Sequence, residues 1–414
     1  MKYTKQEVLQ FVEEEDVKFI RLAFCDVFGK QKNISIMPGE LERAFKYGIA
    51  IDAWSIAGSD ESIRSDLFLH PDPSTLSVLP WRPDHGRVVR MFCAITWLDG
   101  TPFEGDTRHL LISAVQEAET AGYTFHIGAE AEFYLFKLDD HGNETHIPYD
   151  HAGYMDIAPE DKGENIRREI CLTLEQMGIY PESSHHEEGP GQNEIDFRYS
   201  DPLTAADNTV TFCTVVRTIA NRNGIYADFT PKPLRDLPGN GMHVNFSVHR
   251  KNAVGNALLQ ESDDTHLMQS AIAGVLHHIE DMTVFLNPCD ASYERLGCCK
   301  APRYITWSHE NRSQLIRIPA ALNEFRRAEL RSPDPSANPY IAYTLLIYAC
   351  LDGIQNNIVL PEPANINFYH ADKELQRGFR SLPASLREAS RIAQNSAFIH
   401  EHLPAMLISA YTGQ

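Results

Sequence analysis

One acidic segment, residues 184–198, constrains this chain more than any other. At its centre Gly189-Pro190-Gly191 has the composition of a tight turn, since proline presets φ and glycine accepts a positive φ. After the turn, Glu194, Asp196 and Arg198 occupy alternate positions, which predicts a strand with one polar face. The turn would bring Glu187 beside Glu194, and two adjacent carboxylates repel each other unless a cation lies between them. We therefore expect a divalent metal with oxygen ligands here; the alternative is a solvated acidic turn.

The composition excludes some classes of partner. The 414 residues include 37 basic and 57 acidic ones, and the net charge of −20 argues against nucleic acid or an anionic membrane as the main partner. The first 18 residues lack the apolar core of a signal peptide, and no apolar stretch reaches membrane-spanning length. Eight cysteines without a CxxC pair indicate free thiols in a reducing compartment. We expect a cytoplasmic protein that binds neither nucleic acid nor a membrane.

The pattern of elements predicts two domains of an α+β protein. Residues 1–103 read as a small strand-rich domain, with a helix over 4–15 and a hairpin formed by 18–26 and 31–37. The stretch 100–105, with two glycines and a proline, is the expected boundary. Residues 104–414 form the larger domain, with helices expected over 108–122, 165–178 and 205–224.

Four strands of the larger domain each offer a polar face. A single such face usually meets solvent, and an isolated strand glutamate or histidine is usually just solvated or hydrogen-bonded. Four of them in a domain rich in apolar strand faces predict a charged cavity lined by a curved antiparallel sheet. Five carboxylates and one imidazole suffice for two divalent sites of three ligands each. These candidate metal ligands are Glu130, Glu132, Glu187, Glu194, His243 and Glu329.

Arginines gather where acidic residues are few. They are Arg295, Arg312, Arg317, Arg327 and Arg331, with Arg312 and Arg317 on a strand-like stretch over 311–319. Guanidinium groups beside oxygen-ligated metals suit phosphoryl transfer, because they neutralise charge on the phosphoryl oxygens. The alternative is a set of surface salt bridges.

Taken together, these residues resemble the glutamine synthetase family of bacterial class I. The matching motifs are Ser65-Asp66-Leu67 with Pro71-Asp72, Gly128-Ala129-Glu130-Ala131-Glu132-Phe133, His185-His186-Glu187 with Gly191-Gln192-Asn193-Glu194, Pro231-Lys232-Pro233, Gly241-Met242-His243, Asn311-Arg312-Ser313 with Arg317-Ile318-Pro319, and Glu329-Leu330-Arg331 before Asn338-Pro339-Tyr340. They follow the family's order over most of the chain. The resemblance implies a small N-terminal β-grasp domain, a large catalytic domain and ring-shaped homo-oligomers. These are typically dodecamers of two stacked hexamers, with each active site between neighbouring subunits.

The resemblance also implies roles for single residues. Glu132, Glu187 and Glu194 match the ligands of a first metal, and Glu130, His243 and Glu329 match those of a second; Mg²⁺ or Mn²⁺ is expected. Gly239, Arg295 and Arg331 match positions that hold the amino-acid substrate. Arg312, Arg317 and Arg327 match positions that hold ATP phosphates, and Glu182 and Ser247 match nucleotide-side positions. Asp52 and Ser55 match the loop on the ammonium side.

Three departures from the family's pattern stand out. The asparagine that usually helps to hold the amino acid is Pro238 here. The flap reads Gly297-Cys298-Cys299-Lys300-Ala301-Pro302, about one residue short, with Lys300 where the family has a glutamate. The C-terminal region lacks a clear adenylylation loop, so regulation by adenylylation is not expected.

The expected activity is that of an ATP-dependent carboxylate–amine ligase. A carboxylate of glutamate would attack the γ-phosphoryl group, with charge drawn off by the second metal and Arg317, and an amine would then displace phosphate. Asp52 is the candidate proton acceptor, and Glu187 is expected to assist with ammonia. The amine is ammonia in the first hypothesis and an organic amine, such as an alkylamine or polyamine, in the second. Lys300 bears on this choice, because an ammonium pointing into the pocket would repel the substrate, whereas burial would deprotonate it. The alternative is that the shortened flap turns Lys300 to solvent and leaves Asp52 and Glu187 to manage ammonia alone. A third hypothesis is a catalytically silent ring protein.

Overall fold

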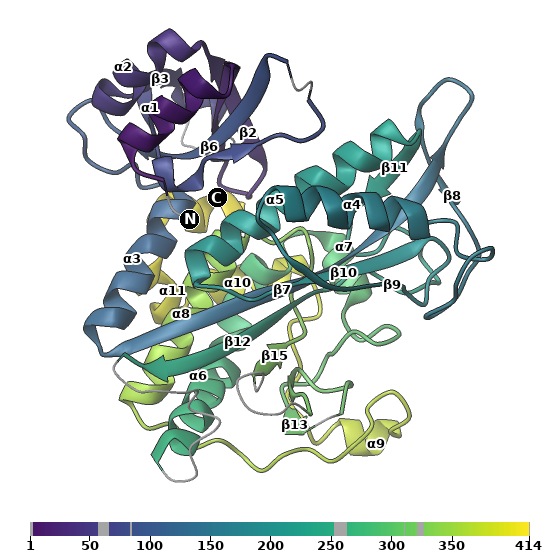
Figure 1. Ribbon diagram of the computed structural model, residues 1–414. Coiled ribbons are helices and arrows are strands. Elements are labelled where there is room, and N and C mark those ends of the chain that lie inside the picture. The colour runs from purple at the N-terminus through teal and green to yellow at the C-terminus, as the bar shows by residue number, and fades with distance from the viewer. Residues whose placement is uncertain are drawn as a thin grey trace.

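The computed structural model describes residues 3–56, 66–82, 85–251, 263–309, 311–320 and 327–413. Ser65 of the first matching motif lies outside these residues. Two sheets dominate the fold (Figure 1). The smaller, N-terminal sheet lies at one end of the molecule, and a long sheet with helices packed against it makes up the rest. Among the described residues, no helix is both long and apolar enough to cross a membrane.

The N-terminal unit is a mixed sheet with two helices. Its strands run in the order β2-β1-β6-β4-β3, with β5 added on β6; β1 pairs in parallel with β6 and antiparallel with β2. A capping box begins the first helix, because Thr4 accepts from the amide of Glu7 and the Glu7 carboxylate accepts from Thr4. The elements are α1 (Lys5–Glu14), β1 (Val17–Cys25), β2 (Gln31–Ile36), α2 (Leu41–Tyr47), β3 (Ile49–Asp52), β4 (Asp66–Pro71), β5 (Ser77–Val78) and β6 (Arg87–Thr96).

The larger unit is built on a long curved sheet in the order β13-β14-β15-β12-β7-β10-β9, with β8 and β11 also paired to β7. Its pairs are antiparallel except for β13 and β14, so the expected antiparallel sheet is wrong for that one pair. The strands are β7 (Tyr123–Leu138), β8 (Glu144–Pro148), β9 (Pro181–His186), β10 (Gln192–Phe197), β11 (Ile225–Asp228), β12 (Met242–Arg250), β13 (Trp307–His309), β14 (Ile316–Ile318) and β15 (Ala328–Leu330).

Helices cover the apolar side of this sheet (Figure 1). Two of them approach closely at glycines, since a Cβ on Gly274 would lie 2.0 Å from the carbonyl oxygen of Ala349 and 2.8 Å from Cα of Gly353. The helices are α3 (Thr107–Thr120), α4 (Glu164–Gln176), α5 (Pro202–Arg222), α6 (Asp263–Leu286), α7 (Asp290–Arg295), α8 (Pro339–Gln355), α9 (Lys373–Gln376), α10 (Leu386–Gln394), α11 (Ala397–His402) and α12 (Ala405–Thr412).

The long strand β7 shows the alternation that the sequence predicts. Phe125, Ile127, Ala129, Ala131 and Phe133 are all buried against the helices. Because successive strand residues point to opposite faces, the residues between them face the other side of the sheet. That other side carries the candidate site.

A buried arginine ties the two units together. Arg108, at the start of α3, forms ion pairs with Asp72 of the N-terminal unit at 3.0 Å and with Asp207 on α5 at 2.9 Å. Two residues earlier, Asp106 caps α3 and also accepts a hydrogen bond from the amide of Ile95 on β6, at 2.8 Å. Cap and ion pairs together fix how the N-terminal sheet sits on the larger unit.

Candidate active site

The register of the sheet brings the acidic side chains into one row. Glu194 on β10 lies opposite Glu132 on β7, and Asp196 lies opposite Glu130. On the other side of β7, His243 of β12 is also opposite Glu130. Directly opposed residues share a face of the sheet, so these five side chains project to the same side.

The row continues across the next two strands. Asn245 on β12 lies opposite Glu329 on β15, and Glu329 lies opposite Arg317 on β14. Three residues separated by long stretches of sequence are thereby placed side by side. The sheet's pairing, rather than any loop, sets the geometry.

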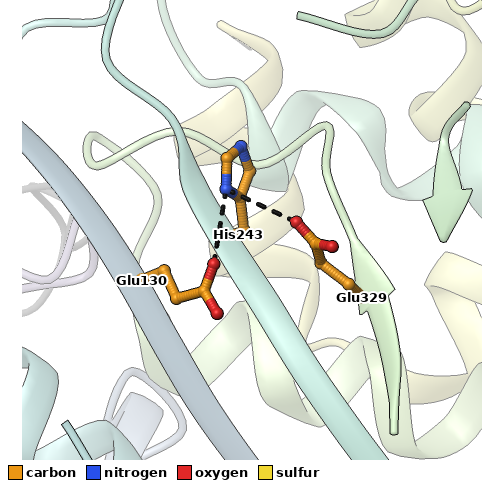
Figure 2. Close-up of side chains that lie close together, drawn as sticks. All are labelled: Glu130, His243 and Glu329. Atoms are coloured by element: carbon orange, nitrogen blue, oxygen red, sulfur yellow. Dashed lines mark ion pairs between the residues drawn. The ribbon is translucent and has the colours of Figure 1, made fainter. Parts of the chain in front are cut away.

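Three of these residues form a compact ligand group, drawn in Figure 2. Nδ1 of His243 lies 3.7 Å from a carboxylate oxygen of Glu130 and 3.6 Å from one of Glu329. Glu329 is fully buried and forms ion pairs with Arg317 and Arg331. Burial alone would raise the pKa of Glu329, but the positive charge of Arg331 and the neighbouring His243 outweigh burial and lower the pKa to about 2. Glu329 is therefore ionised at neutral pH.

A second concentration of donors surrounds Glu194. One group that is compact enough for a metal contains Glu132, Glu194 and His243, and another contains His185, Glu187 and Glu194. The set expected from the sequence, Glu132 with Glu187 and Glu194, is thus spread over two groups that share Glu194. The proximity of Glu187 and Glu194 is as predicted.

Mutual repulsion is strong around Glu194. Burial, and then the negative charges of Asp196 and Glu132, raise the pKa of Glu194 well above 4.5. Burial and the charge of Glu130 likewise raise the pKa of Asp196 to about 6. Hard oxygen donors held together against their own repulsion fit a divalent cation, which would relieve the repulsion that these pKa values record. The residues present therefore fit the expected metals.

Two further residues of this site, Asp196 and His185, were not among the candidate metal ligands predicted from the sequence. Asp196 forms, with Glu130 and Glu194, a group that is compact enough to hold a metal ion. His185 lies 2.9 Å from Glu187. For Asp196 the signal was present, because it lies two residues after Glu194 and so shares its face of the strand. His185 pairs across the strand with Glu194, which only the register reveals.

All five candidate arginines line one cavity of about 500 Å³, together with all six candidate metal ligands. Arg295 is 3% exposed and donates to the carbonyl oxygens of Ser332 and Arg331 at 2.8 and 3.3 Å. Arg327 donates to the side-chain oxygen of Asn245 at 2.7 Å. The alternative of surface salt bridges is thus wrong for Arg295 and Arg331, which are buried beside the cavity.

Arg312 differs from its prediction. It lies in a turn before β14 and not on a strand, although it lines the cavity. The cause is local: the side-chain oxygen of Asn311 accepts hydrogen bonds from the amide and the hydroxyl of Ser313, both at 2.9 Å. Such a bond from a side chain to the backbone two residues ahead favours a turn over a strand.

The loop before β12 shapes one part of the cavity, where Pro238 and Gly239 lie. Gly239 allows a close approach, since a Cβ there would lie 2.2 Å from the carbonyl oxygen of Pro231. Gln192 donates to the Gly239 carbonyl at 3.2 Å, and the hydroxyl of Tyr134 donates to the carbonyl of Pro238 at 2.7 Å. Pro238 thus lines the cavity, and its carbonyl oxygen already accepts the hydrogen bond from Tyr134.

Lys300 lies at the rim of the cavity. It is about half exposed, forms an ion pair with Glu188, and its ammonium lies 5.1 Å from the ring centre of Tyr154. Lys300 is not buried, so the alternative that rested on its burial lacks its premise, and the alternative in which the flap turns Lys300 toward solvent agrees with its exposure. The carboxylate of Glu188 offsets the charge of Lys300. The expected repulsion between Lys300 and an incoming ammonium is therefore weaker.

Four residues that were predicted to belong to the site lie away from this cavity in the single chain. Asp52 is exposed at the end of β3 in the N-terminal unit, where it accepts from the amide of Trp54 at 2.9 Å. The hydroxyl of Ser55, nearby, is buried and has no hydrogen-bond partner among the residues that the structure describes. Glu182 is exposed on β9, and Ser247 is buried on β12 with its hydroxyl 2.9 Å from His249. None of these four is among the described residues that line the cavity.

A second compact group, formed by the buried residues Asp150, Asp161 and His186, lies beside the turn that carries Glu187. Asp150 contacts His186 at 2.9 Å and accepts from the amide of Gly191 at 3.0 Å. Asp161 pairs with the guanidinium of Arg167. These buried carboxylates have their charge and lone pairs engaged by protein groups, so the group anchors the turn between β9 and β10, on which Glu187 lies.

Comparison with known proteins gives the same picture for the whole chain. Residues 104–413 match the family model described as "Glutamine synthetase, catalytic domain" and residues 16–98 match "Glutamine synthetase, beta-Grasp domain". The two matches together take in almost the whole chain, so they assign the N-terminal sheet to a β-grasp domain and the long curved sheet to the catalytic domain.

Curated relatives match over nearly their full length. A protein named glutamine synthetase from Methanosarcina mazei is 46% identical over 414 residues, covering 99% of this chain and 92% of the relative. One of the same name from Clostridium saccharobutylicum is 45% identical over 394 residues, covering 94% and 88%. Among solved structures, "GmaS/ADP complex-Conformation 1" has a TM-score of 0.88 at 26% identity, and "Apo GmaS without ligand" has 0.87 at 27%. Each comparison covers 98% of this chain and 94% of that one.

Proposed function

The chain belongs to the glutamine synthetase family and is an ATP-dependent glutamate–ammonia ligase, and we propose that the row of ligands across β10, β7, β12 and β15 organises its chemistry. The observation that carries this proposal is the convergence of six candidate metal ligands and five arginines on one cavity. The comparisons support neither the organic-amine hypothesis nor the silent ring protein.

In this proposal two divalent ions, Mg²⁺ or Mn²⁺, bind side by side. Glu130, His243 and Glu329 would hold one ion, whose chemistry is to withdraw charge from the phosphoryl group of ATP. The other would be held by the donors around Glu194, namely Glu132, Glu187 and Glu194. The raised pKa values of Glu132 and Glu194 support this assignment, because burial and neighbouring negative charge disfavour their ionised forms. The pKa of Glu187 is instead lowered, because the hydrogen bond with His185 outweighs burial.

The arginines divide between the two anionic substrates. Arg295 and Arg331 are buried at the end of the cavity near Gly239, where they suit the carboxylates of glutamate. Arg312 in the turn before β14, Arg317 on β14 and Arg327 just before β15 also line the cavity and suit the phosphates of ATP. The ion pair with Glu329 holds Arg317 in place beside the cavity. Its guanidinium therefore does not have to reorient during the reaction.

The two half-reactions then follow in order. The side-chain carboxylate of glutamate attacks the γ-phosphoryl group, which gives an acyl phosphate and ADP. Ammonia next displaces phosphate and must lose a proton. Glu187 faces the cavity and is positioned to hold the ammonium. Asp52 lies in the N-terminal unit and is not among the described residues lining its own cavity, so we assign it to the cavity of a neighbouring subunit.

That assignment requires an assembly. We propose a ring-shaped homo-oligomer, a dodecamer of two stacked hexamers, in which the N-terminal domain of one subunit closes the cavity of the next. Trp54, two residues after Asp52, supports such a contact because it is a large apolar side chain that is 66% exposed in the isolated chain. We also propose a domain boundary between residues 103 and 104, and a cytoplasmic location, which eight free thiols support.

A phosphate-release assay tests the function. Purified protein would receive glutamate, ATP and Mg²⁺ together with ammonia, methylamine or longer amines. Saturable phosphate release with ammonia, matched by glutamine formation and unmatched by any organic amine, is the expected result. Faster turnover with an organic amine would contradict it, as would phosphate release that does not depend on a divalent metal.

A further inference from the structure

Two adjacent thiols lie in the flap beside the cavity. The amide of Ala301 donates to the carbonyl of Cys298 at 3.0 Å, which closes a tight turn over residues 298–301. Within this dithiol turn Cys299 adopts φ +54°, a left-handed conformation uncommon for a residue other than glycine. The turn brings Sγ of Cys298 to 3.3 Å from Sγ of Cys299. Both side chains line the cavity, and Cys299 is exposed.

A buried lysine points at one of these sulfurs. Lys232 is only 9% exposed, and its ammonium donates to Sγ of Cys298 at 3.1 Å and to the carbonyl oxygen of Leu237. Burial alone would raise the pKa of Cys298, but the hydrogen bond from Lys232 outweighs burial and lowers it. Burial raises the pKa of Cys299. The pair thus holds one activated sulfur and one protonated thiol.

We propose that Cys298 and Cys299 form a modification site at which a hydroperoxide converts the two thiols to a disulfide. The thiolate of Cys298 attacks the outer oxygen of the peroxide, the O–O bond breaks, and the alkoxide or hydroxide leaves and takes a proton from water. Cys298 is then a sulfenic acid. The thiol of Cys299 attacks its sulfur, and water leaves as the disulfide forms. The two thiols lose two electrons and the peroxide gains them.

The geometry suits this chemistry in three respects. The attacking sulfur lies beside a cation, the resolving sulfur is already adjacent, and the open cavity admits a small oxidant. Adjacent Cα atoms are about 3.8 Å apart, whereas ordinary disulfides span about 4.4 to 6.8 Å. Strain of this kind makes a disulfide easier to reduce, so the modification is reversible by a thiol reductant.

Oxidation would change the rim of the cavity. Lys300 follows the two cysteines directly, and its carbonyl oxygen accepts a hydrogen bond from the hydroxyl of Tyr369 at 2.9 Å. Disulfide formation must draw the two sulfurs together to about 2.05 Å, which alters the dithiol turn and with it the position from which Lys300 reaches Glu188. The sulfur of Cys298 also leaves Lys232, whose other contact holds the loop before Gly239. On the function proposed above, ligation would therefore fall; the oxidation chemistry itself does not depend on that function.

Peptide mapping tests the modification directly. Trypsin cleaves after Arg295 and Lys300, which releases residues 296–300 with both cysteines and no other. The full-length protein with Mg²⁺ would be treated with hydrogen peroxide and quenched with iodoacetamide at intervals. We expect this peptide to lose the mass of two hydrogen atoms and to escape alkylation, and a dithiol reductant to restore it. Ligase activity should fall and recover in step with the peptide.

Variants separate the parts of the proposal. Lys232→Met should slow oxidation of the peptide by on the order of tenfold, because an unassisted thiol is mostly protonated at neutral pH. Cys299→Ser should block the disulfide and allow Cys298 to proceed to sulfinic acid. Cys171→Ser, a change to a half-buried thiol on α4, is the matched control and should leave oxidation of the peptide unchanged.

Two results would overturn the proposal. One is oxidation of the peptide no faster than that of a peptide containing Cys171; the other is a disulfide that forms at the same rate in Lys232→Met. If the disulfide forms but activity is unaffected, the regulatory effect on the cavity is wrong while the modification stands. Absence of any ligase activity before oxidation would instead count against the proposed function.

Discussion

Metal binding to this protein should release protons, and the release should be smaller in Glu194→Gln. Burial and the charges of Asp196 and Glu132 raise the pKa of Glu194, so in the metal-free protein this carboxyl retains a proton at mildly acidic pH. A metal ligand must be deprotonated, so the incoming ion competes with that proton. Asp196, whose pKa is raised to about 6, should release a further fraction of a proton near that pH.

The magnitude follows from linkage. Each proton displaced makes the dissociation constant fall tenfold per unit rise in pH, which is about 1.4 kcal/mol per pH unit. The dependence is steepest at low pH, where Glu194 is protonated before the ion arrives. It fades as the pH rises through the pKa of Glu194, because the free site is then already ionised.

Calorimetric titration with Mn²⁺ in buffers of different ionisation enthalpy measures this directly. At mildly acidic pH we expect net proton release on metal loading, and less of it in Glu194→Gln. Glu119→Gln, the same chemical change at an exposed carboxylate paired with Lys251, is the matched control and should behave as the wild type. Heats that do not depend on the buffer, with an affinity that does not change with pH, would refute the argument that the carboxylates repel one another in the metal-free site.

Other substitutions test the remaining assignments. Glu132→Ala should abolish ligation, because the other carboxylates then face an incomplete site; wild-type turnover in this variant would rule out its role as a ligand. Asp52→Ala and Glu329→Ala should each be inactive alone but regain partial activity in mixed rings, and failure to complement in proven mixed rings would mean that one chain holds a whole site. Lys300→Ala should leave the charge of Glu188 uncompensated at the rim and lower the KM for ammonia several-fold, since such a charge pair is worth about 1–4 kcal/mol in water-exposed surroundings. A raised KM for ammonia would show that Lys300 does not oppose the substrate.

Strand periodicity made much of the site predictable. The alternation along β7 placed Glu130 and Glu132 on one face because successive residues in a strand point to opposite sides. The same rule applied to β12 and found His243. It also marks Asp196 through its spacing from Glu194, although that residue was not singled out.

Contacts between segments far apart in the sequence were not predictable in this way. Nothing in the local pattern around Lys300 indicates its ion pair with Glu188, which depends on how the flap meets the turn after β9. The register that places His185 opposite Glu194 is likewise set by the hairpin as a whole. Arg312 was misplaced on a strand because the competing hydrogen bonds of Asn311 act over two residues and override the strand pattern.

The positions of the bound ions test the central claim most directly. Crystals grown with Mn²⁺ and an ATP analogue, measured at the manganese absorption edge, would locate each ion by its anomalous signal. The account predicts two peaks in each subunit, one between Glu130, His243 and Glu329 and one at the carboxylates around Glu194. A single peak, or a peak at the buried group of Asp150 and His186 in place of these, would contradict it.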